Sequence, residues 1–239
     1  MALAGGPWLT APMIEELPAV DLEQAFRAFI LEPSFPCVAA KAAVHGNVCR
    51  VEVYDELAGN SETARLSSDL LAFANATEES DYRTFAAVFR SPRELDEAAF
   101  EALLWRQLEQ LNARDAERFP WDPAVSSDPD DPHFGFSFAA HAFYVVGLHA
   151  NSSRDARRFP WPTLVFNFHE QFQRLRAKGK WQRMQHTIRE RDEQLQGSIN
   201  PMINDFGVSS EARQYSGRAV EKDWHAPFTP AIGKCPFHH

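Results

Sequence analysis

The sequence lacks the short motifs that mark the common phosphate, zinc and serine-hydrolase sites. It has no GxGxxG and no GxxxxGKS/T, so a glycine loop that cradles phosphate is not indicated. It has neither HExxH nor paired CxxC motifs, which leaves a zinc site unsupported, and it has no GxSxG nucleophile elbow. Any chemistry must therefore rest on residues that no familiar short motif connects.

Long apolar runs and a cysteine framework are also missing. No run approaches the roughly 20 apolar residues of a membrane span, and the first nine residues lack the basic and apolar regions of a signal peptide. The three cysteines, Cys37, Cys49 and Cys235, are an odd number in a chain large enough to fold without disulfides. We therefore expect a protein of the reducing cytoplasm with no membrane partner.

Positive charge is scarce, since 24 Lys and Arg face 33 Asp and Glu and the net charge is -9. Broad nucleic-acid binding is disfavoured, because neutralising phosphates requires clustered cations. One local exception is the cluster of Arg154, Arg157 and Arg158. Such a cluster suits the carboxylate or phosphate of a small molecule better than a duplex.

The periodicity of apolar residues predicts one α+β domain over residues 1–239, with its core at about 20–237. Strands are expected at 48–54, 85–89, 134–138, 142–148 and 163–168. Helices are expected at 21–30, after a cap at Ser61, after a Ser91-Pro92 capping box, and at 169–196 with a break at Gly179 and a stop at Gly197. Because the strands cluster, the sheet should be mixed or mostly antiparallel, with flanking helices.

Two histidines and one cysteine occupy positions typical of site residues. His149 and His169 each follow a predicted strand, and Cys37 stands in the phrase Phe-Pro-Cys. A thiolate can bind iron or act as a nucleophile. Each residue also has a structural interpretation: His149 bonded to a loop carbonyl, His169 exposed beside a capping Asn167, and Cys37 as a small buried hydrophobe.

The segment from 200 to 218 is rich in hydrogen-bonding side chains, among them Glu211, Arg213, Tyr215 and Arg218. Long irregular segments of this kind are often functional, which favours a wall of a substrate site. The alternative is a rim of Arg–carboxylate pairs that holds the segment to the body of the protein.

Several phrases, taken in order, resemble the FPC/CPF-motif family of YqcI/YcgG-like proteins. They are Phe35-Pro36-Cys37, Gly147-Leu148-His149, Ser152-Ser153-Arg154, Phe166-Asn167-Phe168-His169, Gln196-Gly197-Ser198, the run from Ser210 to Arg218, and Cys235-Pro236-Phe237. The resemblance extends from about residue 35 to residue 237. One departure is Ala150, where proline is expected after Gly-Leu-His.

This resemblance implies a haem-dependent enzyme, because some members look like N-hydroxylases of guanidine or amine substrates that use O2 and an external electron donor. The haem would be non-covalent haem b, since the sequence has no CxxCH. Its axial ligand is assigned first to His149, with His169 and Cys37 as alternatives.

The same resemblance gives roles to charged residues. Three arginines would bind the haem propionates: Arg154, Arg157 and Arg158. Glu211 or Asp205 would hold the cationic group of a small-molecule substrate, Arg213 or Arg218 would clamp a carboxylate, and Tyr215 would complete the wall.

Two other function classes stay open at this point. One is a non-enzymatic protein that binds haem or another small ligand, and the other is a thiol-dependent enzyme that uses Cys37. A visible spectrum separates them, because haem gives a Soret band. The sequence leaves the oligomeric state open, a homodimer included.

Overall fold

Five strands form one mixed sheet in the computed structural model, which describes residues 19–77, 80–200, 202 and 206–231. The strands are β1 (Cys49–Glu56), β2 (Thr84–Ser91), β3 (Phe136–Phe138), β4 (His141–Leu148) and β5 (Thr163–Phe168), in the order β1-β2-β5-β4-β3. β1 and β2 pair in parallel, and the other three neighbouring pairs are antiparallel. This confirms the predicted α+β class and its mixed sheet in a single domain.

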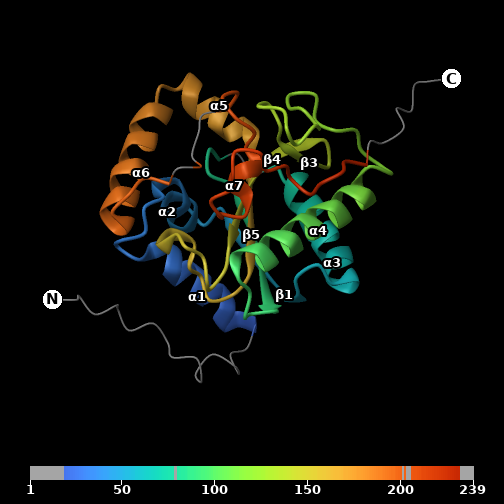
Figure 1. Ribbon diagram of the computed structural model, residues 1–239, viewed down its shortest axis with the longest axis horizontal. Coiled ribbons are helices and arrows are strands. Elements are labelled where there is room, and N and C mark those ends of the chain that lie inside the picture. The colour runs from blue at the N-terminus through green and yellow to red at the C-terminus, as the bar shows by residue number, and fades with distance from the viewer. Residues whose placement is uncertain (1–18, 78–79, 201, 203–205, 232–239) are drawn as a thin grey trace.

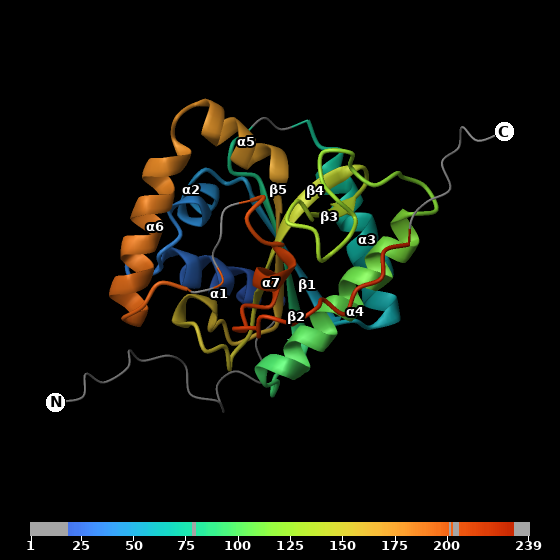
Figure 2. The same cartoon turned by 45° about the horizontal axis from the view of Figure 1, so that its top comes forward.

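Helices cover both faces of the sheet (Figures 1 and 2). They are α1 (Ala19–Leu31), α2 (Val38–His45), α3 (Asn60–Ala74), α4 (Glu97–Asp115), α5 (His169–Ala177), α6 (Trp181–Gln196) and α7 (Ala212–Tyr215), with a 3₁₀ turn at Asp155–Arg157. α3 and α4 lie on one side, and α1, α2 and α6 lie on the other. No helix among the described residues is long and apolar enough to cross a membrane.

Alternation along the strands divides the apolar core into two layers. In β5, Leu164 and Phe166 belong to the layer beneath α3 and α4, whereas Val165 belongs to the layer beneath α1 and α2. β4 follows the same rule, since Val145 joins the first layer and Val146 packs against the second. Because successive side chains of a strand point to opposite faces, one sequence pattern supplies both layers.

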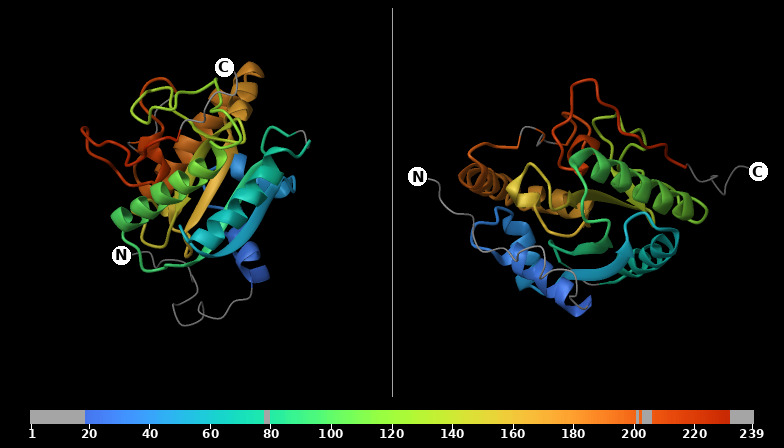
Figure 3. Two further views of the ribbon diagram at one scale, coloured as in Figure 1. Left: turned by 90° about the vertical axis from the view of Figure 1, so that its right-hand side faces the viewer. Right: turned by 60° about the horizontal axis from the view of Figure 1, so that its bottom comes forward.

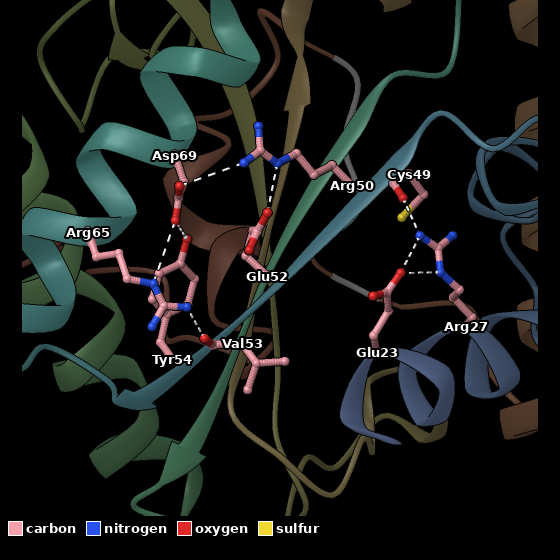
Figure 4. Close-up of polar contacts among 9 residues, drawn as sticks. All are labelled: Glu23, Arg27, Cys49, Arg50, Glu52, Val53, Tyr54, Arg65 and Asp69. Atoms are coloured by element: carbon pink, nitrogen blue, oxygen red, sulfur yellow. Dashed lines mark hydrogen bonds and ion pairs between the residues drawn. The ribbon is translucent and has the colours of Figure 1, made fainter. Parts of the chain in front are cut away.

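The outer strand β1 has its free backbone edge blocked by arginine side chains (Figure 4). Arg27 of α1 donates to the carbonyl of Cys49 at 2.9 Å and is held by Glu23. Arg65 of α3 donates to the carbonyl of Val53. Charged side chains on an edge strand discourage pairing with a second sheet, so these contacts protect β1.

Two predicted helix caps were wrong. Ser91 ends β2, and α4 instead begins after Asp96, whose side chain accepts the Ala99 N–H at 2.7 Å. The predicted Ser61 cap lies inside α3, which begins at Asn60 after Gly59 and has no side-chain cap. Ser91 is not a cap because β2 extends beyond the short apolar run that predicted it. Asp96 is the residue that accepts a backbone N–H at the start of α4.

The predicted break and stop in the long polar helix are confirmed. Gly179 has φ +65° and separates α5 from α6, and Gly197 has φ +76° and ends α6. Left-handed backbone favours glycine, which has no Cβ. The sequence did not predict α2, whose N-cap is Cys37, because cysteine is not among the residues that usually cap a helix.

Asp115 is a buried carboxylic acid at the end of α4, where it is 5% exposed. Its Oδ1 accepts the backbone N–H of Ala139 at 2.8 Å, which ties α4 to the β3–β4 turn. Burial raises the pKa of Asp115 to about 6, because the ionised form loses hydration.

We expect Asp115→Asn to flatten the dependence of stability on pH. The folded state keeps the proton between pH 3.8 and about 6, so the contribution of Asp115 is complete at lower pH and is lost as pH rises through this interval. Asparagine cannot ionise. Between pH 4 and 7 the free energy of unfolding of the variant should therefore rise by about 1–3 kcal/mol relative to that of the parent. Denaturant unfolding at several pH values measures this, and a constant difference between the two proteins would contradict it.

Candidate functional site

A cavity of about 270 Å³ lies on the α2 and α6 side of the sheet, against the face of β4 that carries Tyr144 and Val146. Its walls come from the chain before α2, the 3₁₀ turn, α5, α6 and the segment that leads into α7. Five residues predicted for the site line it together: Cys37, Arg154, Arg157, His169 and Glu211. The structure therefore gathers residues that are up to 174 positions apart in sequence.

The cavity walls are mainly apolar, which favours a ligand with a large hydrophobic surface. Apolar side chains come from every wall: Phe35, Val146, Phe172, Trp181, Ile188 and Phe206. A second hollow of about 670 Å³ shares Arg176, Trp181, Gln185 and Phe206 with the cavity. The shared residues form the mouth, which lies where α5 turns into α6.

Cys37 is the N-cap of α2, and its sulfur accepts the backbone N–H of Ala40 at 3.5 Å. Backbone donors and the helix dipole favour a thiolate at this position. Burial acts in the opposite direction and is the larger effect, so the pKa of the Cys37 thiol is raised. Without a bound cation, the residue is therefore a neutral thiol at the cavity wall.

His169, Glu211 and Tyr215 form a buried hydrogen-bonded chain. The His169 Nε2 lies 2.7 Å from Glu211 Oε2, and the Tyr215 hydroxyl donates to Glu211 Oε1 at 2.5 Å. Burial raises the pKa of Glu211, although both hydrogen bonds oppose that shift. The chain joins α5 to α7 and presents Glu211 and His169 to the cavity.

Arg154 and Arg157 bring buried positive charge to the cavity. Arg154 pairs with Asp192 of α6 at 2.6 Å. Arg157 has no ion pair among the described residues, and it donates instead to the carbonyls of Gly147 and Tyr215 at 3.2 and 3.1 Å. Burial lowers the pKa of Arg157, because its charge is poorly compensated. An anionic ligand group would supply the missing compensation.

Gly217 makes room for Arg157. Its φ is +86°, and a Cβ built on it would lie 2.6 Å from the Arg157 Cδ. Any other residue would displace the guanidinium or the chain that follows α7. The turn after α7 therefore helps to place the charge in the cavity wall.

His149 lies apart from the cavity lining. Its ring stacks on Phe100 of α4 at a centroid distance of 4.4 Å, and it is 1% exposed. Neither ring nitrogen has a hydrogen-bond partner among the described residues, and burial lowers the pKa of the imidazole. The nearby backbone of Leu95, in the loop before α4, opposes that shift, which keeps the loop-carbonyl interpretation of His149 open. The structure does not bring His149 to the other predicted ligands.

Three predicted arginines also lie away from the cavity lining. Arg158 is exposed and pairs with Asp155. Arg213 donates to backbone carbonyls of the chain after α7, at Val220, Glu221 and Trp224. Arg218 pairs with Glu101 at 2.7 Å. The 200–218 segment therefore combines both interpretations, with Glu211 on the cavity and Arg213 and Arg218 in structural contacts.

Several cavity residues were not predicted. Tyr144 donates to Gln214 at 2.6 Å, and Asp192 holds Arg154. The alternation of the β4 strand carried a signal for Tyr144, since it shares a face with Val146. Nothing in the sequence near Asp192 pointed to a partner 38 positions earlier. Predicted Asn167 capping of α5 was wrong, because Asn167 contacts Thr84 across the sheet instead.

Other predicted elements stay untested. Asp205 and the Cys235-Pro236-Phe237 phrase lie outside the described residues. Within the described part of the chain, no three His, Cys, Asp or Glu residues are grouped as ligands of a metal ion.

The structure is thus a mixed α/β fold with a largely apolar cavity that several buried charged residues also line. Comparison with known proteins identifies the family. The profile of the YqcI/YcgG family matches residues 26–229, and the chain belongs to that family. It is 25% identical over 221 residues to the uncharacterized protein YcgG of Bacillus subtilis (strain 168), covering 86% of this chain and 81% of that protein. No solved structure matches it significantly.

We expect Tyr215→Phe to destabilise the fold by about 1–3 kcal/mol, the range for leaving buried polar groups unpaired. The hydroxyl donates to Glu211, and it accepts the N–H of Phe136 at 3.1 Å. Tyr82→Phe is the control, since its hydroxyl makes no hydrogen bond among the described residues. Denaturant unfolding measures both variants, and equal stabilities would rule out a structural role for the Tyr215 hydroxyl.

Proposed function

We propose that the cavity binds haem b together with a small guanidino or amino-acid-type substrate, and that the protein hydroxylates a nitrogen of that substrate. One observation carries the proposal: a thiol, a buried carboxylate and a buried guanidinium face one largely apolar cavity, in Cys37, Glu211 and Arg157, and the guanidinium has no ion pair in the described part of the chain. The family resemblance supports the same chemistry, through members that look like N-hydroxylases.

The donor set of the cavity fits a haem, whose ring would also extend into the adjoining hollow of about 670 Å³. Iron in haem needs only one or two protein ligands, because the porphyrin supplies four nitrogens. The cavity offers the Cys37 thiol from one wall and His169 from another. A coordinated thiol loses its proton to the metal's charge, and the backbone N–H of Ala40 at 3.5 Å then supports the thiolate. We therefore assign the axial ligand to Cys37, in preference to His149.

When bound, the haem would supply oxygen activation, and thiolate ligation promotes cleavage of the O–O bond. The reaction balances as R–NH₂ + O2 + 2 electrons + 2 protons giving R–NHOH + H₂O, with an N–H bond replaced by N–O. The chain must therefore provide a substrate position, a source of protons and exclusion of bulk water.

Glu211 is the residue best placed to hold a cationic substrate group. It is 5% exposed, so an ion pair with a guanidinium or ammonium forms in a site of low polarity, where it is strong. His169 lies 2.7 Å away and can share a proton with it. The hydrogen-bonded Tyr215 fixes the Glu211 carboxylate, which positions the substrate nitrogen for reaction.

Arg157 would bind a negatively charged group of the haem or of the substrate. It has no ion pair among the described residues. Its two described hydrogen bonds both come from Nη1, so other N–H groups of the guanidinium fork can donate to a ligand. A haem propionate and a substrate carboxylate both match this fork. Arg157 therefore takes over the clamp role predicted for Arg213 and Arg218.

A thiol-dependent enzyme is the weaker alternative. The thiolate is the nucleophilic form of cysteine, and burial raises the pKa of Cys37. A metal ion reverses that shift, whereas a thiol catalyst would need a base hydrogen-bonded to its sulfur. The described contact of the sulfur is with a backbone N–H only.

Replacement of the proposed iron ligand should abolish normal haem binding. We expect Cys37→Ala to lose the parental Soret band, or shift it, on titration with haem, because no other described residue of the cavity lining is a thiol. His149→Gln is the control and should keep the parental spectrum, since His149 lies off the cavity. The reverse pattern would restore His149 as the ligand, and an absent Soret band in the parent would end the haem proposal.

Neutralising the buried carboxylate should weaken substrate binding. Loss of one buried charge-assisted contact costs ~2–5 kcal/mol, so Glu211→Gln should reduce affinity for L-arginine or guanidine by orders of magnitude while haem loading persists. Glu101→Gln is a matched control, because Glu101 is also buried but pairs with Arg218 away from the cavity. Substrate affinity by calorimetry and the melting temperature decide: a destabilised Glu211→Gln protein with parental affinity would leave Glu211 a structural role only.

A further inference from the structure

The helical hairpin of α5 and α6 concentrates positive charge in an acidic protein. Residues 174–191 contain seven Lys and Arg and one acidic residue, so they carry +6 in a chain of net charge -9. The rest of the chain therefore carries -15. We call this segment the basic hairpin, and its cations are Arg174, Arg176, Lys178, Lys180, Arg183, Arg189 and Arg191.

Most of these cations are not neutralised within the described protein. Asp81 pairs with Arg174 and Lys178, at 3.4 and 2.5 Å, and Arg174 has a second partner in Glu170. The other five cations have no ion pair among the described residues. Lys180 and Arg183 are exposed near the start of α6, so their charge is available to a partner.

The basic hairpin forms one side of the cavity mouth. Arg176 and Trp181 line both the cavity and the outer hollow, and the Arg176 guanidinium lies 5.0 Å from the Trp181 ring centroid. Arg189 lines the cavity from α6. A partner seated on this surface would thus stand directly over the entrance to the site.

We propose that the basic hairpin docks a small acidic electron-carrier protein, such as one with an iron–sulfur cluster or a flavin. The inference rests on the proposed function, whose reaction consumes two electrons that no residue of the chain supplies. Each encounter would oxidise the carrier by one electron and pass that electron to the haem site, so two encounters would supply the two electrons of one turnover. Complementary charge accelerates such encounters and orients them.

The shape of the charge distribution favours a small globular partner over an extended polyanion. A nucleic acid or an anionic membrane that covered the basic hairpin would extend beyond it, and the rest of the chain carries a net charge of -15. A small acidic protein can cover the hairpin alone. Like-charge repulsion around the patch would then restrict docking to the cavity mouth.

The test compares two matched double charge reversals in the full-length protein. Lys180→Glu with Arg183→Glu changes the basic hairpin, and Arg106→Glu with Arg114→Glu makes the same charge change at exposed positions of α4. α4 and α6 lie on opposite sides of the molecule (Figure 1). An acidic [2Fe–2S] ferredoxin and a flavodoxin serve as probes, with binding measured by calorimetry at low and high salt.

We expect at least one probe to bind the parent at low salt, with affinity that falls as salt rises. The hairpin variant should lose about tenfold or more in affinity, and the α4 variant should lose about twofold or less. The reduction rate of haem-loaded protein by the bound probe should follow the same order.

Other outcomes would overturn the inference. These are equal losses in both variants, no binding of either carrier, or stronger binding to anionic phosphatidylglycerol vesicles or single-stranded DNA than to the carriers. The haem titration is scored separately from carrier binding. Carrier binding without a Soret band would therefore remove the oxygenase proposal while leaving the docking surface, and a Soret band without carrier binding would do the reverse.

Discussion

A carboxylate that is almost fully removed from water organises the centre of this protein. Glu211 cannot be buried without partners, because an uncompensated charge in a protein interior is costly. Its two oxygens take one partner each, His169 at the start of α5 and Tyr215 of α7. Since α5 follows the central strand β5 directly, this contact fixes the late segment of the chain to the middle of the sheet.

The position of Tyr215 extends that constraint to the other layer. Its ring stacks on Trp105 of α4 at 5.6 Å, and its hydroxyl meets the backbone of β3 and β4. Beyond it, the chain runs along α4 (Figure 3), where the N–H of Ala231 donates to Asn112 at 2.6 Å. Short β3 covers only the first part of β4, and α7 packs beside that strand. One buried hydrogen-bonded chain thus joins the aromatic core to the cavity wall.

The two buried arginines near this centre differ in their partners. Arg154 is satisfied by Asp192, whereas Arg157 lines the same cavity without a carboxylate partner in the described structure. The buried Arg157 therefore faces the same space as the buried Glu211 without a carboxylate partner among the described residues. A ligand with two charged ends, or two ligands that each bring one, completes the compensation that the fold leaves open.

Local patterns predicted most of the framework. The five strands appeared at their expected places because alternation and β-forming residues report directly on a half-buried or buried strand. Glycine at 179 and 197 marked a real break and a real stop, because left-handed backbone is a local requirement. The errors were also local: Asp96, not Ser91, caps α4, and α2 was missed because Cys37 is an unusual cap residue.

The sequence by itself determined the fold class, the strand positions, the family resemblance and five of the residues that meet in the cavity. Only the tertiary structure decided which polar residues face that cavity. Arg213 and Arg218 are close to Glu211 in sequence yet point to the chain after α7 and to α4, while Arg157 arrives from another part of the chain. The physical reason is that side-chain direction and burial depend on contacts between distant segments, such as Arg154 with Asp192 across 38 positions, and no local pattern encodes those contacts.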